Sequence, residues 1–242
     1  MYRDEHILIE SLHLKTIKAM DLNNIQIRET QIEDFNAIME IHEQAFRNKK
    51  EPELVAYLLA DESGKPAISL LALYNGQPAG HILFTRSYFD GQQEQPMMHI
   101  LAPLAVKPEF QRQGIGGKLI KAGIRLLQEK GSNLIFVLGH KEYYPQYGFL
   151  PHATRLGYPA PYYIPDELGE YWMVQPISKT GFGIGKGKIK CADAMNRPEY
   201  WREWWVKRII IIMIIRDDSP ETSNGLFFCF FLFNNIFSLT FL

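Results

Sequence analysis

The sequence predicts an α/β domain built on a mixed, mostly antiparallel central sheet flanked by helices. Three observations predict it: two helical segments follow one short strand, a strand–turn–strand segment comes next, and a glycine-rich helix then joins two apolar strands. The 242 residues allow one large domain or a medium domain with extensions. Apolar residues make up 46% of the chain and charged residues 22%, which is ordinary for a soluble globular protein.

Composition and charge exclude several classes of protein. The formal net charge is −1 and no stripe of lysine or arginine overrides it, so nothing indicates a nucleic-acid partner. The two cysteines form neither a disulfide framework nor a CxxC pair, and the seven histidines are scattered, so no metal site is expected. This use of cysteine fits the reducing interior of a cell, and we expect a cytoplasmic protein.

The first part of the domain is predicted to be one strand followed by two helices. Residues 25–29 alternate like a short strand, and Thr30 is a plausible N-cap for the helix after it. Residues 31–46 carry apolar side chains at helical spacing. This apolar set is Ile32, Phe35, Ile38, Ile41 and Phe46. Residues 51–60 predict a second helix, with a proline in its first turn, where a missing N–H group does no harm.

The middle of the chain predicts a hairpin and then a strand–helix–strand unit. Residues 67–89 read as strand, turn and strand around an Asn-Gly pair, the strongest short-range hairpin signal. Residues 96–108 form an apolar strand, the glycine-rich helix follows, and residues 132–139 form a buried strand. No linker interrupts residues 25–177, so we expect one domain there.

The two ends of the chain differ in composition from this domain. Residues 1–24 carry charges throughout and are either an extra amphipathic helix or an extension. Residues 178–203 are interpreted as a C-terminal segment of the domain, and residues 204–242 as an apolar tail. The apolar part of this tail is too short for a typical membrane span and is interrupted by two asparagines. We therefore favour a tail outside the functional domain over a membrane anchor.

Residues 108–120, PEFQRQGIGGKLI, combine the start of an amphipathic helix with three glycines, Gly114, Gly116 and Gly117. Each glycine in a helical turn costs about 1 kcal/mol relative to alanine. The N–H groups in the first turn of a helix have no intrahelical partner, and with the helix dipole they form an anion site. We interpret the glycines as a turn that lets a diphosphate touch these N–H groups. Close packing of the helix against a strand is the alternative.

Two other phosphate motifs are excluded by counting. Gly-x-x-x-x-Gly-Lys-Ser/Thr does not occur, because Gln111 stands where its first glycine is needed and Leu119 follows the lysine. GFGIGKGK, residues 181–188, has a lysine where a Rossmann fingerprint needs glycine or alanine, and no βαβ unit surrounds it. We interpret that segment as a flexible loop or a hairpin tip.

The order of the elements and the glycine turn resemble the GNAT family of acetyl-CoA-dependent N-acetyltransferases. The family motif Q/R-x-x-G-x-G/A is matched in full by QRQGIG, residues 111–116, and the strand residues PLAV precede it. YYPQYGF, residues 143–149, matches the family pattern of an aromatic residue, a tyrosine, three residues and Gly-Phe. The resemblance covers residues 25 to 200, most of the chain outside its two ends.

The resemblance implies acetyl-CoA as a cosubstrate and no metal. The diphosphate would lie on the glycine turn, and the pantetheine arm would lie along the strand before it like an added strand. GNAT folds separate this strand from the next one through a bulge, which opens a V-shaped slot for the arm. The implied cofactor-binding residues are Leu104, Ala105, Val106, Gln111, Arg112, Gln113, Gly114, Ile115, Gly116 and Gly117.

The resemblance also assigns an acid but no base. The leaving thiolate needs a proton, and a tyrosine, with an ordinary pKa of about 10, is a well-matched general acid. The family pattern places this role on Tyr144. Histone-type members carry a glutamate on the central strand, where this chain has Ile100, so the base stays open. The candidates are His99, Glu94, Glu142 and a water chain, and His99 is more typical of an ordinary strand histidine.

These features predict an acetyl-CoA-dependent N-acetyltransferase that acts on a primary amine of a small molecule or peptide by direct attack on the thioester. A rival from another class is a non-catalytic acyl-CoA-binding or regulatory module, tethered to a membrane by the tail, and Tyr144 argues against it. The resemblance also allows a homodimer, because GNAT domains commonly pair. The acceptor is recognised by loops, whose sequences carry little transferable chemistry.

Overall fold

The computed structural model describes residues 24–201, and within them one mixed sheet carries three α-helices. The strands are β1 (Ile25–Glu29), β2 (Ile68–Tyr74), β3 (Gln77–Phe89), β4 (Met98–Val106), β5 (Leu134–Leu138), β6 (Trp172–Pro176) and β7 (Ile189–Lys190). The helices are α2 (Phe35–Phe46), α3 (Lys50–Ala60) and α4 (Ile115–Glu129), and short 3-10 turns join several elements. The predicted fold class is confirmed.

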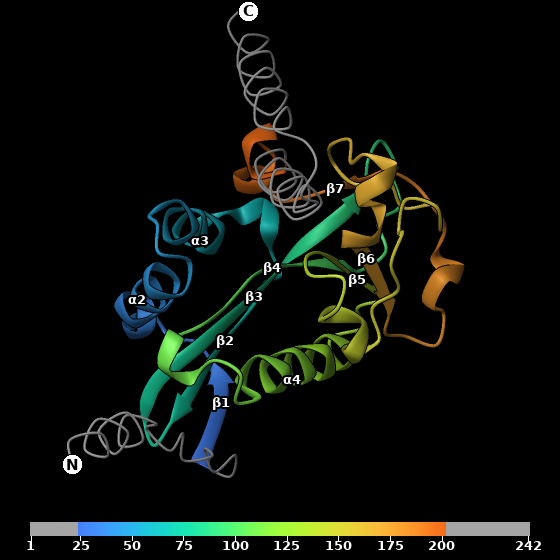
Figure 1. Ribbon diagram of the computed structural model, residues 1–242. Helices are drawn as coiled ribbons and strands as arrows, with labels where there is room; N and C mark the ends of the chain where they lie inside the picture. Colours follow the sequence, from blue (N-terminus) through green and yellow to red (C-terminus); the bar gives the residue numbers. More distant parts are fainter. Residues whose placement is uncertain (1–23, 202–242) are drawn as a thin grey trace, which may run out of the picture. The chain divides into compact units, whose positions relative to one another are not determined.

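The sheet has the strand order β1-β2-β3-β4-β5-β6, and β7 pairs with the last residues of β3. Neighbouring strands are antiparallel except β4 and β5, which run parallel because α4 returns the chain to the same end of the sheet. The predicted hairpin is β2–β3, and Asn75 and Gly76 both have the positive φ of a two-residue turn. Figure 1 shows α4 on one face of the sheet, and α2 with α3 on the other.

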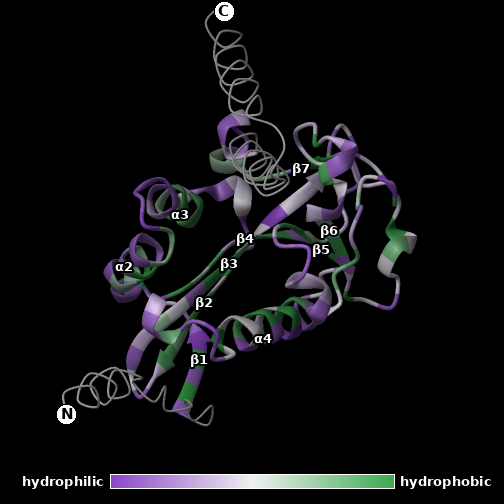
Figure 2. Ribbon diagram, in the orientation of Figure 1, coloured by the Kyte–Doolittle hydropathy of each residue, from purple (hydrophilic) through white to green (hydrophobic). Residues whose placement is uncertain are grey.

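The main core lies between α4 and the sheet. Side chains of β2, β3 and β5 pack against the apolar face of α4, where Ile115 and Leu119 are buried. Figure 2 shows hydrophobic residues along the central strands and on α4. Burying each large apolar side chain contributes about 1.5–3 kcal/mol. A smaller cluster on the other face joins α2 to β2 and β4 through Ile41, Leu71 and Ala105. This packing holds the start of α4 beside the end of β4.

The first predicted helix differs from expectation at its start. Residues 32–34 form a 3-10 turn, and the α-helix begins only at Phe35. The tighter turn shifts the phase of the side chains, so Ile38 and Ile41 are buried while Ile32 is 86% exposed. The exposed members of the predicted apolar face are Ile32, Phe35 and Phe46. Only the middle of this helix therefore contributes to the core.

The segments at the two ends were expected to be separate from the domain. Residues 1–23 and 202–242 lie outside the described residues, and so do the expectations for the extension and the apolar tail. The compact unit that contains the sheet ends at Asn196.

Residues 181–188 contain a short 3-10 turn and lead into β7. In the described part of the chain, no helix combines the length and apolar character needed to cross a membrane. The domain boundaries stay predictions.

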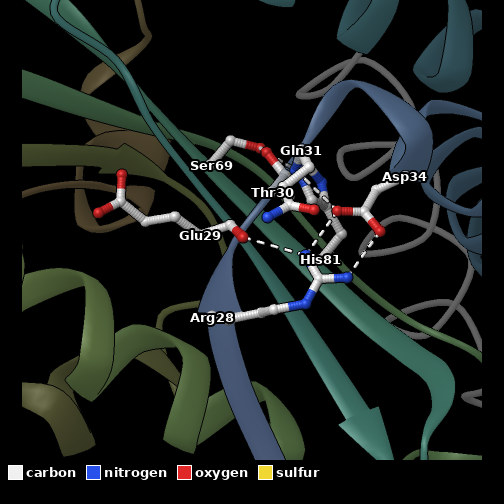
Figure 3. A network of polar contacts seen from close by, with 7 residues as sticks. All are labelled: Arg28, Glu29, Thr30, Gln31, Asp34, Ser69 and His81. Atoms are coloured by element: carbon white, nitrogen blue, oxygen red, sulfur yellow. Dashed lines mark hydrogen bonds and ion pairs between the residues drawn. The ribbon is translucent and has the colours of Figure 1, made fainter.

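A polar network ties the turn after β1 to the sheet (Figure 3). Arg28 donates to both carboxylate oxygens of Asp34, over 2.6 and 2.8 Å, and this pairing lowers the pKa of Asp34 to about 2. The prediction of Thr30 as a helix N-cap is wrong, because Gln31 occupies the cap of the 3-10 turn. The Thr30 hydroxyl instead donates to the hydroxyl of Ser69 over 2.8 Å.

Two histidines continue this network into the interior. Ser69 lies 2.8 Å from Nε2 of His81, and Nδ1 of His81 lies 2.8 Å from Nε2 of His42 on α2. Burial disfavours the charged imidazole, so it lowers the pKa of His42 to about 3 and the pKa of His81 well below its ordinary value. Burial also lowers the pKa of His99, on β4, to about 4. All three side chains are therefore neutral at pH 7 in the folded protein.

We expect the protein to lose stability as the pH falls from 7 to 5.5. His42, His81 and His99 have folded-state pKa values below their unfolded value near 6.5, so the unfolded chain binds their protons first and acid favours unfolding. Each histidine contributes a loss of about 1 kcal/mol over this interval. Urea denaturation at the two pH values measures the loss.

The control for this pH effect is a change at an exposed residue that does not titrate. His81→Gln should make the pH-dependent loss smaller, because one buried imidazole is removed. Gln44→Ala should leave it unchanged, because the exposed Gln44 side chain does not titrate. Equal stability at pH 7 and pH 5.5 in the unaltered chain would contradict the assignment.

Candidate active site

β4 separates from β5 partway along its length. The two strands pair only between Met98–Ile100 and Leu134–Phe136. In contrast, β4 stays paired with β3 as far as Val106. The register between β3 and β4 shifts at Ala102 and Pro103, which form the extra residues of a bulge. Beyond this bulge, β4 runs along β3 alone.

The three strand residues expected to carry the pantetheine arm lie in this separated part of β4. Leu104, Ala105 and Val106 pair with β3 on one side. On the other side, no described strand follows β4 past Ile100. An unpaired edge presents the N–H and C=O groups that an extended segment can join as an added strand. The fold therefore places a free strand edge directly before the glycine turn.

Two residues in the left-handed region shape the turn between β4 and α4. Arg112 has a φ of 59° and Gly114 a φ of 85°, and Gly114 is the N-cap of α4. Glycine adopts this conformation without strain, so the backbone alone requires Gly114. The Gln111 side chain donates to the carbonyl of Val106 over 2.9 Å, and the Gln113 side chain donates to a carbonyl at the start of the turn. These bonds hold the turn against the end of β4.

Most amides of this turn have no backbone acceptor. From Arg112 to Gly117, no amide N–H donates to a backbone carbonyl of the residues that the structure describes. The first amide that does so is that of Lys118, which donates to the carbonyl of Gly114 over 3.1 Å. Because α4 begins at Ile115, these amides lie at the positive end of its dipole. The turn has the donors and the potential that an anion needs.

Gly116 and Gly117 also have a packing role, with a partner that the sequence did not reveal. A Cβ on Gly116 would lie 2.5 Å from the hydroxyl oxygen of Tyr143. A Cβ on Gly117 would overlap the hydroxyl of Tyr147. These two glycines are therefore required by the approach of two tyrosines, and the predicted alternative of close packing holds in part. The packing partner is the segment after β5 rather than a strand.

Tyr144, the expected acid, is buried and 8% exposed. Its ring meets those of Tyr143 and Phe149 edge to face, with centroids 5.3 and 5.6 Å away. The ring also fills the space beside Gly139, the residue that follows β5. Burial raises the pKa of Tyr144 above its ordinary value, so the hydroxyl keeps its proton at neutral pH. A protonated side chain next to the end of β5, where the two strands are apart, suits a proton donor.

The candidate bases are not gathered at this turn. His99 is an interior residue whose Nε2–H donates to the carbonyl of Pro66 over 3.0 Å, while Nδ1 lies 2.9 Å from the hydroxyl of Ser132. Both ring nitrogens are engaged, as expected for an ordinary strand histidine. Glu94 is exposed in the loop before β4, at the other end of that strand from the turn. Glu142 is exposed beside the tyrosine segment.

Sequence reasoning missed two groups of side chains near the site. Tyr143 and Tyr147 approach the glycine turn, and the tyrosine-rich segment itself was a visible signal of this contact. The pair of His42 and His81 joins α2 to β3 behind Ala105, the strand partner of His81. The two histidines are 39 residues apart in the chain, so no local pattern predicts their contact.

A cavity of about 360 Å³ lies elsewhere, around Tyr88, Phe89 and Cys191. Gly80 of β3 faces Val106 at the glycine turn, and Tyr88 is eight residues further along the strand, or about 27 Å. The cavity is thus separate from the turn. Among residues 24–201, no three histidine, cysteine or acidic side chains are arranged to hold a metal ion.

We expect the effect of Gly116→Ala on stability to depend on Tyr143. In the unaltered background the new methyl group meets the tyrosine hydroxyl, and overpacking should lower the free energy of unfolding by about 1 kcal/mol despite better helix propensity. In a Tyr143→Phe background the nearest remaining atoms are 3.7 Å from the methyl position, so the same change should be neutral or stabilising. Urea denaturation of the four proteins measures both effects. Equal effects in the two backgrounds would show that the contact is not made.

Comparison with known proteins gives the family. Residues 35–149 match the model of the family described as Acetyltransferase (GNAT) family. A relative from Escherichia coli strain K12, named "Uncharacterized N-acetyltransferase YjhQ", is 49% identical over 174 residues. The matched region covers 72% of this chain and 96% of the relative.

Solved structures have the same fold. The GNAT family N-acetyltransferase YhbS of Escherichia coli, in complex with CoA, is similar with a TM-score of 0.64 and 23% identity, over 72% of this chain and 93% of that one. A GNAT family acetyltransferase of Brucella melitensis, in complex with acetyl-CoA, is similar with a TM-score of 0.56 and 28% identity, over 71% of this chain and 97% of that one. The free strand edge and the unpaired amides agree with these comparisons. The matched family model and the 49% identical relative show that the chain belongs to the GNAT family of acetyltransferases.

Proposed function

We propose that this protein is an acetyl-CoA-dependent N-acetyltransferase that transfers an acetyl group to a primary amine of a small molecule or a peptide. One observation carries the proposal: the amides from Arg112 to Gly117 are unpaired at the start of α4, directly after a strand with a free edge. A diphosphate joined to an extended pantetheine arm has the shape and charge that this arrangement accepts. The acetyl-CoA complex of the Brucella relative supports this choice of donor.

The residues of the turn divide the binding of acetyl-CoA between them. Gly114 gives the turn its shape, and the amides around Ile115 and Gly116 donate to the diphosphate. Arg112 is exposed beside them and adds positive charge. The free edge from Leu104 to Val106 pairs with the amides and carbonyls of the pantetheine arm. The residues named here are among the cofactor-binding residues that the sequence predicted.

The transfer needs a proton at the sulfur atom. The amine nitrogen attacks the thioester carbonyl, the C–N bond forms, and the C–S bond then breaks to release a thiolate. Backbone N–H groups near Val106 stabilise the oxyanion. Tyr144 gives its proton to the thiolate as a general acid. The amine loses its proton to a group that we leave unassigned, and a cytoplasmic location and pairing into a homodimer stay predictions.

We expect Tyr144→Phe to lower kcat by about 10²- to 10⁴-fold, the usual contribution of a general acid. Release of free thiol from acetyl-CoA in the presence of a panel of primary amines measures the rate. Tyr158→Phe is the matched control, because Tyr158 is also fully buried but packs against Phe89 and Phe136, away from the turn. An unchanged kcat in Tyr144→Phe would remove the assignment. CoA binding without thiol release from any amine would favour the non-catalytic module instead.

We expect Gly114→Ala to weaken CoA binding at least tenfold, because alanine disfavours the φ of 85° that orients the amides. Calorimetric titration with CoA measures the affinity. Gly131→Ala is the control: its φ of 78° carries the same strain, and the space around it is open, but it lies beyond the other end of α4. Equal affinities of the two variants would contradict a diphosphate site at the turn.

A further inference from the structure

Tyr143 lies across the space between the start of α4 and the separated part of β4. The position of a Cβ on Gly116 is 2.5 Å from the Tyr143 hydroxyl and 3.7 Å from a methyl group of Leu104. The Tyr143 side chain comes from the segment after β5, whereas the glycine turn comes after β4. The Tyr143 hydroxyl therefore lies directly against the first turn of α4, beside the separated part of β4.

The Tyr143 hydroxyl is held in place by a second tyrosine. The rings of Tyr143 and Tyr147 meet at 65° with centroids 5.1 Å apart, and the Tyr147 hydroxyl approaches Gly117. Burial, followed by the hydrogen bond to Tyr147, raises the pKa of Tyr143 above its ordinary value. Tyr143 thus keeps its O–H proton near neutral pH and carries no charge that would repel an anion.

We propose that Tyr143 is a binding residue for the phosphate end of the donor, and that Tyr147 is the positioning residue that holds it there. This inference rests on the proposed function. The amides of the turn approach a diphosphate from the helix side only, and its outer oxygens need donors from another side. A tyrosine hydroxyl next to Gly116 supplies one at the junction of the diphosphate and the pantetheine arm.

The structure separates the roles of adjacent tyrosines. Tyr144 points into the core beside Gly139 and Phe149, where proton donation to sulfur is proposed. Tyr143 is only partly buried, and its hydroxyl reaches the first turn of α4. Loss of the Tyr144 hydroxyl should therefore affect kcat, and loss of the Tyr143 hydroxyl should affect donor binding. The two phenylalanine variants are each other's matched controls.

The test compares ligands with and without phosphate, using the full chain. CoA carries the diphosphate, and pantetheine carries the same thiol arm without any phosphate. We expect Tyr143→Phe to weaken CoA binding about tenfold in calorimetric titration, because a hydrogen bond to a charged group is lost, and to leave pantetheine binding unchanged. The KM for acetyl-CoA should rise by a similar factor at constant kcat. Tyr147→Phe should weaken CoA binding less, and should have no further effect once Tyr143 is phenylalanine.

Two results would overturn this inference. An equal loss for CoA and pantetheine would mean that Tyr143 supports the arm by packing alone. Unchanged or tighter CoA binding in Tyr143→Phe would mean that the hydroxyl makes no contact or stands in the way. Failure of the proposed function looks different, since the unaltered chain would then bind no CoA or would release no thiol. Thermal unfolding of each variant verifies that it is folded.

Discussion

The parting of β4 from β5 is the constraint on which the rest of the structure depends. β4 keeps its hydrogen bonds to β3 to its last residue, but its bonds to β5 end at Ile100. Unpaired backbone groups near the interior cost free energy unless a ligand or water satisfies them. The same crossover that makes β4 and β5 parallel also requires α4, whose first turn lies where β4 ends. A free strand edge and a set of free amides are thus two results of one topology.

The first turn of α4 contributes to the stability of the fold and also forms the proposed binding site for the donor. Gly114 is needed for the backbone, while Gly116 and Gly117 are needed because tyrosine side chains approach the helix closely. The loss of helix propensity is about 1 kcal/mol for each glycine, and burial of the tyrosine rings against the core offsets it. Because the same glycines contact the tyrosines and belong to the proposed phosphate site, we expect the packing of this segment and the affinity for a donor to be coupled.

Burial keeps several histidines and tyrosines of the interior neutral at pH 7. His42 and His81 form a continuous polar chain between α2 and β3, and burial holds both imidazoles uncharged at neutral pH. Tyr143 and Tyr144 keep their protons for the same reason. The charge at the site therefore comes from the dipole of α4 and from exposed side chains such as Arg112, which suits the recognition of an anionic donor.

The sequence by itself determined most of the elements from β1 to β5 and the glycine turn, but not β6 or β7. The hairpin at the Asn-Gly pair, the apolar strands and the QRQGIG motif follow local rules of spacing and backbone conformation, and these rules do not depend on distant residues. The tertiary structure alone decided which side chains meet. It buried His42 against His81 and brought Tyr143 to Gly116, because each of these contacts joins segments that only the packed sheet places together. The spacing of apolar residues along one helix or strand shows which of its faces is buried. It does not show which other element packs against that face, so it cannot predict such pairs.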